Sequence, residues 1–96
     1  MTKELKERRY RSLHKILYIY EDISKGNCTI EELDTYLSNI SIMFAGMNDL
    51  NPEIRYKTVS SLRGLRELLP ELTHKDIRSC VLGLMEEFER GVVADA

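Results

Sequence analysis

The sequence predicts an all-α protein, built as a four-helix antiparallel bundle. Its 96 residues fit a single domain, since most domains hold roughly 100–150 residues. Hydrophobic residues make up 43% of the chain and charged residues 31%, which is typical of a globular protein. Only 5 glycines and 2 prolines are present, too few turn residues for a succession of short strands. Four helices joined by short connections therefore describe residues 1–96 best.

The first helix is expected at about residues 2–24, where apolar side chains recur at the 3.6-residue period of a helix face. This stripe comprises Tyr10, Leu13, Leu17, Tyr20 and Ser24, with Ile16 and Ile23 beside it. Gly26 and Asn27 then form a helix-ending signal. The second helix is expected at about residues 30–47, because Thr29 and Glu32 have the spacing of a capping box.

The third helix is expected at about residues 52–69. Asn51 is a favourable cap, Pro52 suits the first helical position, and a second proline ends the helix after residue 69. Thr73 and Asp76 form another capping box, which predicts a fourth helix at about residues 74–90. We expect the tail 92–96 to be frayed. Connections this short favour antiparallel packing of successive helices.

Residues 33–69 resemble one unit of the HEAT-repeat family, which has an Asp before a D/N-P turn and an Ile-Arg pair after it. The matching residues are Asp49, Asn51, Pro52, Ile54, Arg55, Leu62 and Leu65, with Thr58 where alanine is usual. No second copy follows in residues 70–96. The resemblance implies a short HEAT-like α–α stack as the alternative architecture, structural polar contacts for Asp49 and Arg55, and a scaffold that binds proteins.

A surplus of apolar residues on the first helix predicts an interface. Residues 16–20 are apolar or aromatic in succession and therefore encircle the helix. Because Leu17 and its stripe face the core, we expect Tyr18 and Ile19 to point away from it and to contact another protein, including a second copy as a homodimer. Arg11 and Lys15 would steer an acidic partner to the same face. The alternative is a tyrosine lying on the surface with its hydroxyl in water.

Four apolar residues lie off the core stripes of the other helices and extend the candidate binding surface. They are Ile42, Tyr56, Val59 and Leu82. Sequence spacing within separate helices does not establish whether these residues converge on one patch.

The basic N-terminal segment supports an alternative function as a small nucleic-acid-binding regulator. Its candidate binding residues are Lys6, Arg8, Arg9 and Tyr10, with the tyrosine available to stack on a base. Two glutamates interrupt the cluster, at Glu4 and Glu7, and the formal net charge of the chain is −2. These acids weaken the nucleic-acid hypothesis relative to protein binding. A helix-turn-helix made by the last two helices is disfavoured, because Glu71 and Asp76 would face phosphates.

No catalytic, metal or cofactor motif accompanies these features. The two histidines, His14 and His74, lie on different predicted helices, and Cys28 and Cys80 lack metal-ligand spacing. No apolar run approaches the roughly 18 residues of a membrane helix, and no secretory signal is recognisable. We therefore expect a cytoplasmic, non-enzymatic regulatory or adaptor protein without cofactor, metal or membrane contact.

Overall fold

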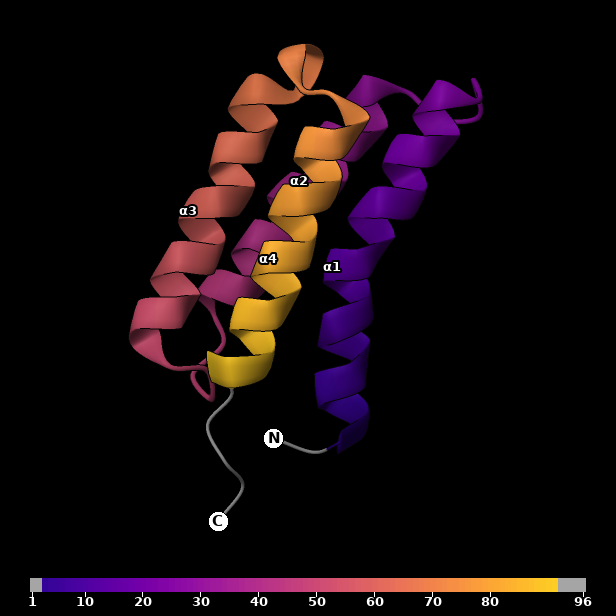
Figure 1. Ribbon diagram of the computed structural model, residues 1–96. Helices are drawn as coiled ribbons and strands as arrows, with labels where there is room; N and C mark the ends of the chain where they lie inside the picture. The colour runs from indigo at the N-terminus through magenta and orange to yellow at the C-terminus, as the bar shows by residue number, and fades with distance from the viewer. Residues whose placement is uncertain (1–2, 92–96) are drawn as a thin grey trace.

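The computed structural model describes residues 3–91 and shows an all-α fold within them, as predicted. Four α helices follow one another along the chain (Figure 1): α1 Lys3–Ser24, α2 Ile30–Ala45, α3 Pro52–Leu68 and α4 His74–Gly91. A 3₁₀ turn, η1 Leu69–Glu71, connects α3 with α4. The predicted fraying of residues 92–96 lies outside the described part of the chain.

Two helices end slightly before their predicted boundaries. α2 ends at Ala45 rather than 47, because the backbone of Gly46 leaves the helical torsion angles (φ −90°, ψ 2°) and the Met47 amide donates to the Phe44 carbonyl three residues back, at 3.2 Å. α3 ends at Leu68 rather than 69, and the chain tightens into the 3₁₀ turn that contains Pro70. Pro70 has no amide hydrogen with which to continue the helical hydrogen bonds, so the regular helix stops here, although Leu69 before it keeps α-helical torsion angles.

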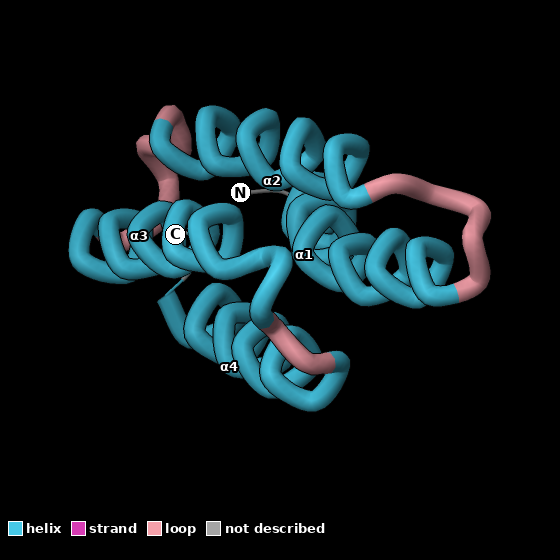
Figure 2. The backbone as a smooth tube through the Cα atoms, turned by 90° about the horizontal axis from the view of Figure 1, so that it is seen from above, coloured by secondary structure: helices cyan, strands magenta, loops and turns pink. Residues whose placement is uncertain are grey.

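The helices form a closed antiparallel bundle. Each one packs against its neighbours in sequence, and α4 returns to pack against α1 (Figure 2). A stack of helical pairs would instead bring α1 beside α3 and α2 beside α4. Among residues 3–91 neither of those pairs has Cα atoms within 8 Å. The architecture is thus that of the bundle, and the resemblance of one segment to the HEAT family remains a prediction.

The core is apolar and receives side chains from all four helices. Phe44 of α2 and Phe88 of α4 are fully buried and meet edge to face, with ring centroids 5.6 Å apart. From α1 only Leu13 and Ile16 are fully buried, so the predicted stripe is displaced around that helix. Tyr10 lies exposed at its edge. The displacement follows from the placement of α1 between α2 and α4, which both cover its sides.

Side-chain hydrogen bonds to backbone carbonyls fix how the helices are placed relative to one another. The Tyr36 hydroxyl on α2 donates to the Ser12 carbonyl of α1 at 2.6 Å. The Tyr20 hydroxyl on α1 donates to the Leu72 carbonyl, just before α4, at 3.1 Å. Both contacts are partly buried, where an unpaired hydroxyl would be costly. They hold α1 against its two neighbours.

The two predicted capping boxes are confirmed. Thr29 and Glu32 exchange side-chain-to-amide hydrogen bonds at 2.8 and 3.2 Å, and Thr73 and Asp76 do so at 3.3 and 3.1 Å. Hydrogen bonds from the Thr73 hydroxyl and the Thr73 amide lower the pKa of Asp76 below its usual 3.8, with a further effect of Lys75. The start of α4 is therefore stabilised by an ionised carboxylate.

This cap makes the stability of the bundle depend on pH. A lowered folded-state pKa means that the stabilisation is present above pH 3.8 and is lost as the pH falls through the folded-state pKa. We expect the urea midpoint of unfolding to fall below about pH 4, and we expect Asp76→Asn to reduce this dependence. Circular dichroism during urea titration at several pH values measures the effect. Identical pH profiles for the two proteins would contradict the cap assignment.

Candidate functional site

The predicted docking residues of α1 do not all face the same way. The Arg11 side chain is 80% exposed and Tyr18 is 58% exposed, so both lie on the outer face. Lys15 is also exposed but leans toward α2, with its ammonium 5.4 Å from the centroid of the Tyr36 ring. Ile19 does not point away from the core as expected, because this side chain is half-buried and packs against the core; its contact with another protein stays a prediction.

Tyr18 takes part instead in a groove between α1 and α4. The upper part of this groove is lined by His14, Leu17, Tyr18 and Glu21 of α1 and by His74, Arg78 and Leu82 of α4. Tyr18 packs edge to face on the His14 ring, with centroids 4.8 Å apart. Leu82 is 43% exposed. The groove thus joins an exposed tyrosine and an exposed leucine from opposite ends of the sequence.

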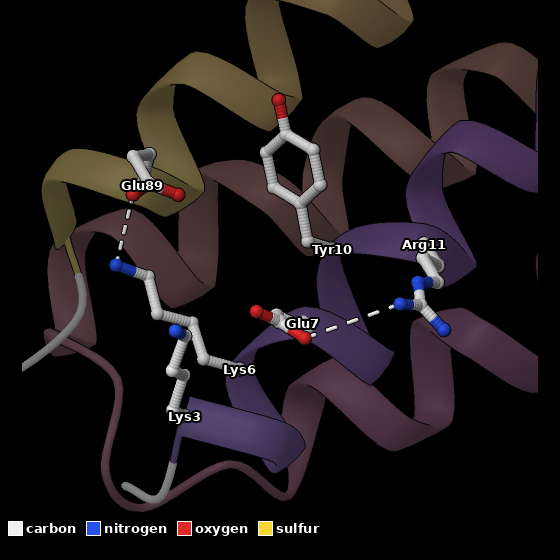
Figure 3. Close-up of a pocket in the computed structure, with 6 residues that line it drawn as sticks. All are labelled: Lys3, Lys6, Glu7, Tyr10, Arg11 and Glu89. Atoms are coloured by element: carbon white, nitrogen blue, oxygen red, sulfur yellow. Dashed lines mark ion pairs between the residues drawn. The ribbon is translucent and has the colours of Figure 1, made fainter.

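A second hollow, which shares no lining residue with the first, lies between the start of α1 and the end of α4. This lower part is lined by Lys3, Lys6, Glu7, Tyr10, Arg11 and Glu89 (Figure 3). An ion pair of 2.8 Å between the Lys6 ammonium and the Glu89 carboxylate links the two helices beside Tyr10. We refer to the upper and lower parts together as the α1–α4 groove. Lys3, Lys6 and Glu89 lie at one end of it and Glu21 and Arg78 toward the other, with Tyr10, Leu17 and Leu82 between them.

Acidic partners neutralise much of the predicted nucleic-acid surface. Lys6 pairs with Glu89, and Arg11 lies 3.9 Å from Glu7 on the same helix. Arg8 is exposed and Tyr10 lies in the groove. Phosphate binding depends on the cations that a surface can offer without a competing carboxylate. The four predicted residues therefore do not form a continuous cationic strip.

The Arg9 side chain is mostly buried and ties two parts of the fold together. It lies on the same helix face as the buried Leu13 and Ile16, and its side chain is only 17% exposed. Its guanidinium donates to both oxygens of Asp49 at 3.0 and 2.9 Å, tying α1 to the connection before α3. The assignment of Arg9 to nucleic-acid binding is not compatible with this inward, paired geometry.

The remaining residues of the HEAT-like segment also have structural contacts. The Asn51 side chain accepts from the amides of Glu53 and Ile54 at 2.9 and 3.4 Å, and Pro52 begins α3. The Arg55 guanidinium donates to the Met47 carbonyl at 3.0 Å. Asp49 and Arg55 therefore bind different parts of the fold. They hold the turn between α2 and α3 in place.

The off-stripe apolar residues do not form one patch. Leu82 lies in the α1–α4 groove, whereas Tyr56 lies beside a hollow between α2 and α3. Ile42 is exposed on α2. Val59 is only 8% exposed and belongs to the core, which corrects its placement off the stripe. Sequence reasoning missed His14 and Arg78 as groove residues because no local signal reveals that α4 packs beside α1.

The reactive side chains have no activating neighbours. Burial, above all, raises the pKa of the Cys28 thiol, with Glu32 and Asp22 adding to the rise, and burial alone raises that of Cys80. A raised pKa keeps a thiol protonated and therefore weakly nucleophilic. Among residues 3–91 no group of three His, Cys, Asp or Glu side chains is arranged to hold a metal ion. The described helices include none long and apolar enough to cross a membrane.

No family model, curated protein or solved structure matches this chain significantly. The function proposed below is therefore based on the geometry of residues 3–91.

The position of Arg9 can be tested by comparison with Arg11. We expect Arg9→Gln to lower the free energy of unfolding by about 1–2 kcal/mol, because it removes a bidentate, partly buried pair and leaves Asp49 without its cation. Arg11→Gln should change it by less than about 0.5 kcal/mol, since its partner is distant and both groups are exposed. Urea denaturation followed by circular dichroism measures both. Equal losses would contradict the structural role of Arg9.

Proposed function

We propose that this protein is a non-enzymatic interaction module that binds another protein through the α1–α4 groove. The supporting observation is the convergence of three exposed apolar side chains, Tyr10, Tyr18 and Leu82, on this one surface. Exposed aromatic residues with arginines at the border are typical of protein interfaces. The other large exposed apolar residues lie apart on α2 and α3: Ile42, Met43, Tyr56 and Leu68.

Tyr18 and Leu82 would form the apolar centre of the interface. A partner covering both would remove them from water together, and each fully buried large side chain contributes about 1.5–3 kcal/mol. Arg11 and Arg78 lie at the border, where charges mainly govern orientation and association rate. Lys15 leans toward α2 and would contribute at the edge. Ile19 supports the surface indirectly by anchoring α1 to the core.

Regulation through nucleic-acid binding is the weaker proposal. It would rely on Lys6, Arg8 and Tyr10 without Arg9, whose guanidinium is held by Asp49. The Lys6–Glu89 pair would have to open for Lys6 to reach a phosphate. The regulatory role, the cytoplasmic location and the adaptor function all belong to the protein-binding proposal.

Site-specific photo-crosslinking tests the proposed surface directly. We expect a photoreactive phenylalanine analogue in place of Tyr18 to give protein adducts in the cells that make this protein. The same analogue in place of Tyr56, an exposed tyrosine on α3, serves as the matched control and should give fewer adducts. Adding Leu82→Asp to the Tyr18 probe should abolish its adducts, because a carboxylate would be desolvated at the centre of the interface. Denaturing electrophoresis and mass spectrometry identify the products.

Adducts from position 56 but none from position 18 would contradict the proposed surface. Adducts at position 18 that persist with Leu82→Asp would show that the groove is not the contact. A photoreactive group at position 18 that reacts only with water would overturn the interaction proposal altogether.

The nucleic-acid alternative has a separate signature. We expect labelled single-stranded and duplex DNA and RNA to show no fluorescence anisotropy change at low salt, because carboxylates already pair with Lys6, Arg9 and Arg11. Binding that weakens steeply between about 50 and 200 mM salt would instead favour the nucleic-acid function. Loss of such binding in Arg8→Gln would locate it on the basic segment.

A further inference from the structure

The exposed edge of α4 carries a charge pattern that is symmetric in spacing and opposite in sign about its centre. Its members are Lys75, Arg78, Leu82, Glu86 and Glu89, all exposed. Arg78 and Glu86 lie four residues before and after Leu82, and Lys75 and Glu89 lie seven before and after it. Residues four and seven apart share a helix face. One stripe of α4 is therefore positive at its beginning, apolar in the middle and negative at its end.

The stability of α4 itself does not explain this order. A helix is favoured by acidic residues near its N-terminus and basic residues near its C-terminus, because of the peptide dipoles. The stripe has the opposite arrangement, with Lys75 in the first turn and Glu89 in the last. Arg78 and Glu86, moreover, form no ion pair with any other residue among 3–91. Their charges are available to a partner.

The neighbouring edge of α1 repeats the pattern. Along the groove, Lys6 lies eight residues before His14 and Glu21 seven after it, with Tyr10 and Leu17 between them on either side. This edge is therefore positive at one end, apolar or aromatic in the middle and negative at the other. His14, the centre of the α1 edge, lines the same part of the groove as Leu82, the centre of the α4 stripe. The two centres therefore lie at a similar level along the helix axes.

After a rotation of 180° about an axis that crosses α1 and α4, the charges of this surface face opposite charges on a second copy of it. We propose that the partner in the α1–α4 groove is a second copy of this chain, an inference that rests on the proposed function. A two-fold axis across the helices would set α4 antiparallel to the α4 of the second copy, with Leu82 at the axis. Arg78 would then face the partner's Glu86, and Lys75 the partner's Glu89, each contact occurring twice as two-fold symmetry requires.

On the α1 side, the same axis sets Lys6 opposite the partner's Glu21 and Tyr10 opposite the partner's Leu17. Lys6 and Glu21 are already paired within their own copy, with Glu89 and Lys25, so the unpaired Arg78 and Glu86 supply the main charge contacts of the dimer. A parallel arrangement of the two α4 helices would instead place like charges together. A partner of uniform charge would be repelled by one half of the surface. The sign pattern thus selects a second copy over an acidic or a basic protein.

The surface over α1 and α4 is large enough for a small dimer interface. α4 has 18 residues and is therefore about 27 Å long, and two helices side by side are about 20 Å wide. Their outline of about 540 Å² per copy corresponds to a weak, transient interface and lies below the ~800 Å² per partner of a standard one. The exposed Tyr10, Tyr18 and Leu82 would lie within it.

Charge-reversal variants, tested alone and in a mixture, show whether Arg78 of one copy faces Glu86 of the other. We expect the wild-type protein to sediment at twice the chain mass of 11.2 kDa in a concentration-dependent manner. Arg78→Glu and Glu86→Arg should each raise the dissociation constant of the dimer by more than about tenfold. Each substitution places like charges at positions 78 and 86 of opposite copies, and two-fold symmetry makes this contact occur twice. An equimolar mixture of the two variants should recover the dimer, and so should the double variant. Arg63→Glu, an exposed reversal on α3, is the matched control and should leave the mass unchanged.

Recovery on mixing also shows that both variants are folded. A wild-type chain that remains monomeric at every concentration would overturn self-association. So would a dimer that neither reversal weakens, or single variants that do not rescue one another. If the monomeric protein still gives adducts with a different protein from position 18, only the second-copy proposal fails. Absence of any adduct from position 18 contradicts the proposed function instead.

Discussion

The packing of α4 against α1 closes the bundle, and every candidate functional contact depends on it. A two-helix hairpin of this length buries one apolar face of each helix and leaves the other in water. The return of α4 brings Phe88 onto Phe44 in the core and seals the side of α1 that carries Leu13. The same packing creates the groove that Tyr18 and Leu82 both line. Stability and the proposed binding surface thus have one physical origin.

The rotation of α1 about its own axis decides which of its many apolar residues reach the surface. Arg9 is turned inward by its pairing with Asp49, and the Tyr36 hydroxyl of α2 holds the same helix three residues further on, at the Ser12 carbonyl. With these contacts made, Ile19 packs against the core and Tyr18 is left outside. Polar contacts that cross between elements therefore decide which side chains of α1 are exposed by fixing the orientation of the helix, in addition to their effect on stability.

The character of the groove favours binding over chemistry. Its histidines pack against tyrosine rings, His14 on Tyr18 and His74 on Tyr20, and both cysteine thiols of the chain have raised pKa values. What distinguishes this surface is the order of its charges, positive and negative about an apolar centre on both α1 and α4. Self-association through this pattern would use the exposed apolar residues that the closed bundle cannot bury.

Local chemistry was sufficient to predict the four helices from the sequence. The capping boxes at Thr29 and Thr73 and the Asn51 cap operate within three residues, and the apolar period follows from helix geometry alone. The exposure of Tyr18 could be predicted in the same way, whereas the burial of Ile19 and Val59 could not. Whether such a residue is buried depends on which helix covers it, and this is a contact between distant segments. The pairing of Arg9 with Asp49 and the placement of Tyr18 and Leu82 along one groove were therefore decided only by the tertiary structure.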